Sequence, residues 1–386
     1  MTSSYAKFRE VRFFGSLDGL RAISIIAVIW LHSWWGTNYY DRLAATPVLR
    51  QGFFGVQVFF VVSGFLITTL LLREMDRYGT ISLRDFYLRR ALRIWPLYYA
   101  VLAIYVVNAL VFERGTIRAH SFLHYLPAFA TFTYTWFVSE NWPGGMFNLA
   151  WTLATEEQFY LFWPLALRVL RSVWSSVLIV AIIALKIATD HSLTSWILPP
   201  GALPTRIVLS VAITICLGVL LAQALHSKRG FDILYSALGW KWSAPVLLMA
   251  LLLCLAPAQP PSLLTFLVTA ALVGACVVRE DNGLAAMLQL RPLAFIGTLS
   301  YGIYLLNSLS VHAVRFPLIR LGLDYPPLIF VCALTLATAL AFLSYRYYES
   351  PFLALKAKFS RLRPFPAESV PAAIAPSDCP PRCNRS

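Results

Sequence analysis

The sequence has few charged residues: Asp, Glu, Lys and Arg make up 13% of its 386 positions. Soluble domains carry about 25% charged residues, so this composition excludes an ordinary water-soluble domain. The six cysteines form no disulfide framework, because most lie inside apolar segments, where cysteine behaves as a small hydrophobe. Cys379 and Cys383 have no histidine or further cysteine beside them. We therefore expect no metal site.

The N-terminal region lacks the features of a cleavable signal peptide. Its first apolar block, residues 17–35, contains Asp18, Arg21 and His32 and has no A-x-A-like cleavage site. We expect this block to be retained as a membrane span. The sequence also shows no internal repeat and no paired broken helices of the kind that transporters often have.

Apolar residues, by contrast, make up 59% of the chain, and the mean hydropathy is +0.67. Apolar blocks of about 20 residues recur throughout, each long enough to cross a hydrocarbon core about 30 Å thick as a helix. The 12 Trp, 18 Tyr and 26 Phe suit aromatic belts at the two interfaces. We predict an all-α polytopic membrane bundle of about ten transmembrane helices. The predicted spans are 17–35, 53–72, 95–112, 152–170, 173–190, 206–225, 243–258, 262–278, 293–313 and 327–348.

The net charge of +14 lies mainly in short loops, so we expect membrane lipids and not nucleic acid as partners. About three quarters of the 32 Lys and Arg residues fall on the same side as the N-terminus, which the positive-inside rule makes cytoplasmic. We expect a multi-pass protein of the plasma (inner) membrane with both termini in the cytoplasm. Residues 1–363 are predicted to form the transmembrane domain, and the Pro-, Ala- and Ser-rich residues 364–386 a disordered tail.

The first span contains ionisable residues, which are costly inside a membrane and are therefore candidates for function. Arg21 and His32 are eleven residues apart, which places them within about 20° of one helix face and about 16 Å apart along the axis. Asp18 is three residues before Arg21, within ion-pair reach. The pattern favours His32 as a general base, although a histidine hydrogen-bonded at the interface would have the same spacing.

A basic segment, residues 73–94, is predicted to form an amphipathic helix on the inner membrane face. Within it, Arg89, Arg90 and Arg93 fall within about one helical turn. Guanidinium groups match phosphate oxygens, so this cluster could hold the phosphates of coenzyme A. The alternative is a positively charged anchor at the inner surface.

Two carboxylates, Glu156 and Glu157, open the fourth span. Adjacent helical residues point about 100° apart, so at most one of them can face His32. A carboxylate bonded to a histidine fixes its tautomer and raises its basicity, as general-base catalysis requires. We favour Glu157 narrowly, because Tyr160 lies three residues further along. A structural Glu–Arg pair is the alternative.

The ninth span contains a polar stripe. Ser300, Tyr304 and Asn307 fall at about 0°, 40° and 340° around one helix. These side chains are candidates for binding the acceptor or the donor, but hydroxyl and amide groups also join membrane helices to each other.

Six segments occur in the order LDGLRA with a downstream His, FFVVSGFLIT, RRALRIWP, WTLATEEQFYLFWP, LSYGIYLLN and SYRYYESPF. Together, over residues 15–355, they resemble the acyltransferase 3 family of integral membrane acyltransferases. Members of that family acylate sugars of lipopolysaccharide, exopolysaccharide, peptidoglycan, nodulation factors or macrolides, generally with acyl-coenzyme A from the cytoplasm.

The resemblance implies that Arg21 and His32 form the family's Arg-x10-His motif, with the histidine as base. It also implies that Arg89, Arg90 and Arg93 form its inner basic motif, that Glu156 or Glu157 is its acidic residue, and that Ser300 and Tyr304 form its Ser-x3-Tyr motif. The family often has histidine where this chain has Asn307, and His312 lies about 120° around the helix from Ser300. This departure argues against a mechanism with two histidines.

We predict a membrane O-acyltransferase that moves an acyl group, in our expectation acetyl, from acyl-coenzyme A to a hydroxyl of a carbohydrate or lipid-linked sugar in cell-surface polysaccharide biosynthesis. Acyl-coenzyme A is the co-substrate, and no bound cofactor is expected. Direct transfer and an acyl-enzyme on Ser300 or Tyr304 both remain open. Relatives that acylate peptidoglycan often carry an appended hydrolase-like domain, which this sequence lacks, so peptidoglycan is the less favoured acceptor. The alternative function is a transporter or flippase of a lipid-linked sugar.

Overall fold

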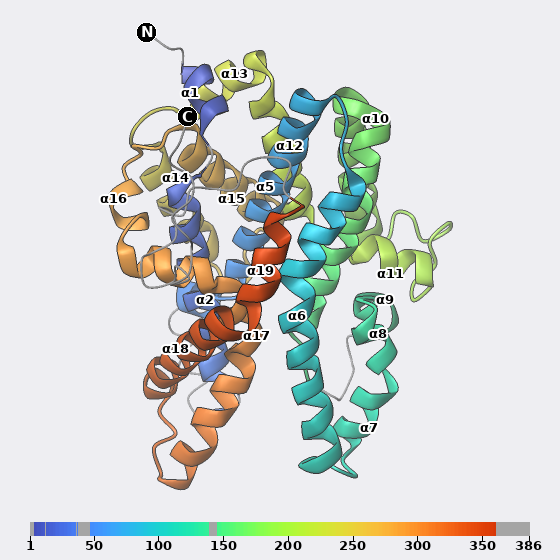
Figure 1. The fold of residues 1–386 in the computed structure, drawn as a ribbon, viewed down its shortest axis with the longest axis vertical. Coiled ribbons are helices and arrows are strands. Elements are labelled where there is room, and N and C mark those ends of the chain that lie inside the picture. The colour runs from blue at the N-terminus through green and yellow to red at the C-terminus, as the bar shows by residue number, and fades with distance from the viewer. Residues whose placement is uncertain (1–3, 12, 36, 38–46, 139–144, 360–386) are drawn as a thin grey trace.

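The computed structural model describes residues 4–11, 13–35, 37, 47–138 and 145–359, and every regular element within them is helical (Figure 1). The predicted tail, 364–386, lies outside the described residues. The elements are α1 (Ser4–Glu10), α2 (Gly15–Trp34), α4 (Pro47–Arg50), α5 (Phe54–Tyr78), α6 (Leu83–Val111), α7 (Ile117–His124), α8 (Leu126–Ala130), α9 (Tyr134–Phe137), α10 (Ala150–Asp190), α11 (Leu203–Leu209), α12 (Ile213–His226), α13 (Lys228–Leu238), α14 (Ser243–Leu255), α15 (Ser262–Val278), α16 (Ala285–Leu288), α17 (Arg291–Arg320), α18 (Pro326–Leu343), the π-helix η1 (Ser344–Glu349) and α19 (Ser350–Ala357).

The protein is a helical membrane bundle, as its composition predicts. Six of the described helices are long and apolar enough to cross a membrane, or up to eight helices if each of two bent pairs counts as one span. The predicted count of ten is therefore not confirmed. One reason is that α15 has only 17 residues, and another is that two of the predicted spans, 152–170 and 173–190, belong to the single 41-residue element α10.

Two bent helix pairs differ from the predicted spans: the bend between α11 and α12 interrupts the span expected over 206–225, and α13 precedes the span expected over 243–258. The axes of α11 and α12 differ by 54°, and those of α13 and α14 by 73°. Hydropathy averaged along a segment does not distinguish a straight helix from two shorter helices of the same total length. The bends therefore could not be predicted from the hydropathy of these segments.

The predicted amphipathic helix over residues 73–94 is wrong. The span α5 continues to Tyr78 and ends at Gly79, whose φ of 73° is the left-handed conformation that glycine adopts without strain. The next span, α6, begins at Leu83, and the Ser82 side chain accepts a hydrogen bond from the Asp85 backbone at its N-terminus. The basic residues therefore occupy the ends of two long helices joined by a short turn.

The helices α2 and α17 form the contact on which the candidate site depends, and they lie side by side in the bundle. They approach so closely that a Cβ atom on Gly297 would lie 2.1 Å from the backbone oxygen of Asp18. Only glycine permits that approach between helix backbones. The contact sets the register of α2 against α17 and brings His32 opposite Asn307.

Candidate active site

His32 lies in the last turn of α2, and its ring is held by Asn307 of α17. The His32 Nδ1 atom is 2.7 Å from Asn307 Oδ1, and Asn307 Nδ2 donates a 2.6 Å hydrogen bond to the Tyr304 backbone oxygen. An amide nitrogen only donates, so this second bond directs Oδ1 towards His32. In a neutral ring Nδ1 then carries the proton, which leaves the lone pair on Nε2 available to accept one.

A cavity of about 60 Å³ adjoins His32 and is lined mainly by apolar and aromatic side chains. The Trp35 ring lies 4.6 Å from the His32 ring, and Phe53 stacks on Trp151 with ring centroids 5.6 Å apart. Trp35 is 47% exposed and Phe53 42%, so these rings extend from the cavity to the surface. The site thus places an imidazole ring beside aromatic faces at an accessible end of the bundle.

The predicted polar stripe on α17 is buried, but its members have different environments. The Tyr304 and Thr152 hydroxyl oxygens lie 2.8 Å apart and link α17 to α10. The Ser300 hydroxyl is buried and has no hydrogen-bond partner among the described residues. Both polar atoms of Asn307 are bonded within the protein. Asn307 thus contacts His32 and the Tyr304 backbone, and its expected part in substrate binding stays a prediction.

Glu156 and Glu157 point to different neighbours, as their spacing requires. The Ser63 hydroxyl donates a 2.8 Å hydrogen bond to Glu156 Oε1, and the charges of Arg21 and Arg90 act on the same carboxylate. Glu157 Oε2 accepts a 3.1 Å hydrogen bond from Trp95 Nε1. Its other oxygen, Oε1, is buried without a partner in the part of the chain that the structure describes.

The expected pairing of His32 with one of these glutamates is not found. The partner of His32 Nδ1 is Asn307, whereas Glu156 lies near Arg21, about 16 Å from His32 along α2. Tyr160, expected to fix Glu157, instead interacts with Glu156. Helical spacing predicts the direction of a side chain around its own axis, but it does not give the depth of α10 relative to α2.

The inner end of the site contains the predicted arginines, which do not form one uniform cluster. Arg21 lies 3.6 Å from Asp18, the ion pair expected from their spacing. Arg89 pairs with Glu74 at 3.2 Å and donates a 2.8 Å hydrogen bond to the Phe359 backbone oxygen.

The other two arginines face different neighbours. The Arg90 guanidinium lies over the Tyr160 ring, 5.4 Å from its centroid. The charge of Arg93 acts on Asp18, Arg21 and Glu349. Arg93 therefore connects the α2 ion pair with the end of the last span.

Sequence reasoning missed three polar residues of this region. Ser63 and Glu74 lie on α5, and Glu349 is buried at the end of η1, where it accepts a 2.9 Å hydrogen bond from the Ser344 hydroxyl. A lone polar residue in an apolar span was the available signal for Ser63. For Glu349, the signal was its place in the SYRYYESPF segment, to which we assigned no role.

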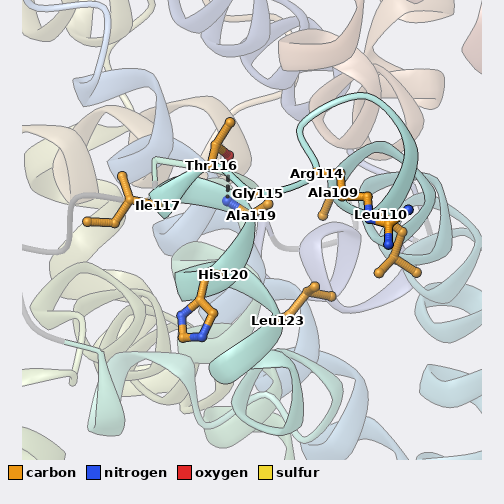
Figure 2. A pocket seen from close by; sticks show the side chains of 9 residues that line it. All are labelled: Ala109, Leu110, Arg114, Gly115, Thr116, Ile117, Ala119, His120 and Leu123. Carbon is orange, nitrogen blue, oxygen red and sulfur yellow. Dashed lines mark hydrogen bonds between the residues drawn. The ribbon is translucent and has the colours of Figure 1, made fainter.

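A larger cavity, about 440 Å³, lies where α6 ends and α7 begins, away from these residues (Figure 2). Its titratable lining residues are Arg114 and His120, and the Thr116 hydroxyl is used to cap α7 by accepting from the Ala119 backbone at 3.1 Å. None of the predicted site residues lines it.

The sequence matches the family model described as an acyltransferase domain over residues 14–346. A putative peptidoglycan O-acetyltransferase of Bacillus subtilis, YrhL, is 32% identical over 370 residues, which cover 90% of this chain and 56% of the relative. The peptidoglycan O-acetyltransferase OatA of Listeria monocytogenes is 28% identical over 382 residues, covering 88% of this chain and 56% of that protein.

A putative O-acetyltransferase of Staphylococcus aureus strain COL is 32% identical over 177 residues, which cover 43% of this chain and 26% of the relative. No solved structure matches the chain. The chain spans little more than half the length of the first two relatives. The family match itself covers most of the chain, and it includes His32, Asn307 and the arginines described above. This multi-pass membrane protein therefore belongs to the acyltransferase 3 family.

Proposed function

We propose that the protein is an O-acetyltransferase that moves acetyl from acetyl-coenzyme A to a sugar hydroxyl of a cell-surface polysaccharide. The observation that carries this proposal is the His32–Asn307 hydrogen bond beside the aromatic-lined cavity. It leaves Nε2 of His32 as the proton acceptor, and an imidazole is the side chain best suited to accept a hydroxyl proton near neutral pH. The family match and the names of the relatives support the same chemistry.

In this mechanism His32 Nε2 accepts the proton of the acceptor hydroxyl while its oxygen attacks the thioester carbonyl. The new oxygen–acyl bond forms, the carbon–sulfur bond breaks, and the proton on His32 passes to the departing thiolate of coenzyme A. Asn307 does not touch the substrate; it holds Nδ1 protonated throughout. Direct transfer therefore needs no covalent enzyme intermediate.

The two ends of α2 are proposed to serve the two substrates. Coenzyme A carries its thioester at the end of a long pantetheine arm, so its phosphates can bind at the inner arginines while the thioester reaches towards His32. A cavity of about 60 Å³ holds roughly two water-sized groups, enough for a reacting hydroxyl and its carbon. The rest of the sugar would lie against the exposed faces of Trp35 and Phe53.

We propose a plasma-membrane location with both termini in the cytoplasm, as the distribution of Lys and Arg favours. The His32 end of α2 then opens to the outer side, where a cell-surface glycan is accessible. YrhL and OatA, which align with most of this chain, are both named for peptidoglycan, and this favours that class of acceptor over the one we expected. We propose a peptidoglycan-type glycan as the acceptor class.

The two bent helix pairs are one observation in favour of the alternative function, a transporter or flippase, because transporters often contain broken helices. The pairs are adjacent in the chain, however, and none of the predicted site residues lies in either of them. Transporters place their substrate sites at such breaks. The position of His32 and the arginines outside the breaks therefore favours the acetyltransferase.

The test is acetyl transfer by the purified full chain in nanodiscs. Radiolabelled acetyl-coenzyme A is supplied with an N-acetylglucosamine oligosaccharide, and with a glucose oligosaccharide as the comparison acceptor. We expect label on the first acceptor, detected by mass spectrometry as an added acetyl group, and none with His32→Ala. Intact acetyl-coenzyme A after incubation with folded wild-type protein and either acceptor would contradict the proposal.

A further inference from the structure

The end of the last span, Pro326–Lys356, lies against the inner end of α6. Helix α19 follows the π-helix η1 and lies against α6, as Figure 1 shows. Beyond α19, the Phe359 backbone oxygen accepts a 2.8 Å hydrogen bond from Arg89. This bond and the packing of α19 on α6 hold the segment against the arginines assigned to the donor. Residues 350–359 lie outside the 14–346 range of the family-model match, and the resemblance assigned no role to them.

Lys356 on α19 brings a further positive charge to this place. Its side chain is half-buried, and the charges of Arg89, Arg90 and Arg93 all act on its ammonium group. Like charges that are partly removed from water repel one another and are costly unless an opposite charge offsets them.

The carboxylates of the same region do not supply that opposite charge to Lys356. Glu74 is paired with Arg89 at 3.2 Å, and Glu349 is bonded to the Ser344 hydroxyl. Among the residues that the structure describes, the charged groups that act on Lys356 are the three arginines and include no carboxylate. Four basic side chains therefore gather at the inner end of α6. Each arginine has a carboxylate nearby, Glu74 for Arg89, Glu157 for Arg90 and Glu349 for Arg93, whereas Lys356 adds a basic group with none, an arrangement suited to an anion.

We propose that Lys356, together with Arg89, Arg90 and Arg93, forms a phosphate-binding site at the inner end of α6. Arginine offers planar pairs of N–H donors to phosphate oxygens, and lysine adds a compact charge that can follow the phosphate as it shifts. The phosphate can come from coenzyme A, which rests on the proposed function, or from an anionic lipid headgroup of the inner leaflet.

The experiment compares wild type with Lys356→Gln, Lys356→Arg and the control Lys358→Gln, which removes an exposed charge two residues away. Each full-length protein is placed in phosphatidylcholine nanodiscs, and coenzyme A binding is measured by equilibrium dialysis. We expect Lys356→Gln to weaken binding about 10-fold, and Lys358→Gln to change it less than about 2-fold. Lys356→Arg should remain close to wild type because it keeps the charge.

Two further arms separate the sources of the phosphate. Dephospho-coenzyme A lacks the 3′-phosphate, so equal affinities of wild type and Lys356→Gln for it would assign Lys356 to that phosphate. In nanodiscs containing phosphatidylglycerol, a lipid phosphate at the site would compete with coenzyme A in wild type but not in Lys356→Gln. Thermal unfolding of each variant shows that binding is compared between folded proteins.

The outcomes also separate this inference from the proposed function. In one outcome, wild type and folded Lys356→Gln bind coenzyme A equally well, and equal amounts of phosphatidylglycerol co-purify with both proteins. This result overturns the phosphate site and leaves coenzyme A as the donor. In another outcome, wild type does not bind coenzyme A, but phosphatidylglycerol co-purifies with wild type and not with Lys356→Gln. This result supports the phosphate site and overturns coenzyme A as the donor.

Discussion

The side chains of His32 and Asn307, 275 residues apart in the chain, meet at a 2.7 Å hydrogen bond between Nδ1 and Oδ1. Asn307 is fully buried and its Nδ2 is committed to the Tyr304 backbone oxygen, so the amide cannot turn to present its nitrogen to His32 without losing that bond. The pair therefore fixes one imidazole tautomer. A carboxylate in this place would stabilise the imidazolium as well, whereas the neutral amide mainly orients the ring.

Asn307→Ala is expected to lower kcat about 10-fold, the rate equivalent of one lost positioning hydrogen bond. The KM for acetyl-coenzyme A should stay unchanged, because Asn307 lies away from the inner arginines. Asn307→His supplies a ring nitrogen that can accept the Nδ1 proton, and it should retain more activity than the alanine variant. Steady-state kinetics measure both parameters, and an alanine variant with wild-type kcat would remove Asn307 from the mechanism.

His32→Ala should reduce acetyl transfer by about 10²- to 10⁴-fold, the usual contribution of a general base. Its thermal unfolding should stay near that of wild type, since His32 is only half-buried. His312→Ala is the matched control, because it removes an exposed histidine of α17. A His32 variant that loses stability but keeps most of its activity would show that the residue has a structural role.

Wild-type activity should increase as the pH rises from about 5 to 8, because a protonated imidazole cannot accept the hydroxyl proton. Activity rises with pH, and does not fall, because His32 becomes a base only when its imidazolium form loses a proton. Rates are measured under conditions in which chemistry limits turnover, with protein stability checked at each pH. A flat profile over this range would be incompatible with His32 as the base.

Glu156→Gln should destabilise the protein more than Glu157→Gln. Glu156 accepts from Ser63 and offsets the charges of Arg21 and Arg90, and removing one partner of a buried charged group leaves the others uncompensated. Glu157 accepts one hydrogen bond, from Trp95, and interacts with the charge of Arg90, while its second oxygen has no partner among the described residues. Thermal unfolding in one detergent compares the two variants.

Activity provides the second comparison between these glutamates. We expect one of the two glutamine variants to lose transfer while it stays folded. Ser63→Ala tests the Glu156 contact separately, and it should lower the unfolding temperature less than Glu156→Gln does. Equal unfolding temperatures for Glu156→Gln and Glu157→Gln would show that the interactions of Glu156 with Ser63, Arg21 and Arg90 do not stabilise the bundle.

The sequence could predict positions around a single helix but not contacts between helices. The 3.6-residue spacing of Ser300, Tyr304 and Asn307 predicts one stripe, and all three are buried. The partner of His32 depends instead on how far α17 is displaced along α2, which the close contact of Gly297 with the Asp18 backbone sets. That contact joins residues far apart in the chain, so no local sequence pattern predicts it.

The same limit applies to the number of spans and to the donor arginines. Apolar length predicts where helices form, but the bends between α11 and α12 and between α13 and α14 depend on tertiary packing. Arg89, Arg90 and Arg93 form one cluster in the sequence, yet Glu74 from the preceding helix pairs with Arg89 alone. Lys356 reaches them because the last span, Pro326–Lys356, ends beside α6.

The two ends of α6 provide a test of the proposed orientation. Thr80 and Arg118 are both exposed and lie just beyond opposite ends of this span. In a variant whose six native cysteines are replaced by serine, Arg118→Cys should react in intact cells with a maleimide that cannot cross the plasma membrane. Thr80→Cys should react only after the cells are permeabilised.

The physical reason is that arginine is concentrated at the Thr80 end of α6, and basic loops are retained in the cytoplasm. Retained acetyl transfer in both cysteine variants would show that the labelled proteins are correctly folded. Labelling in the reverse order would place His32 and its cavity on the cytoplasmic side. That result would remove the outer glycan as acceptor and would move the inner arginines away from the cytoplasmic supply of acetyl-coenzyme A.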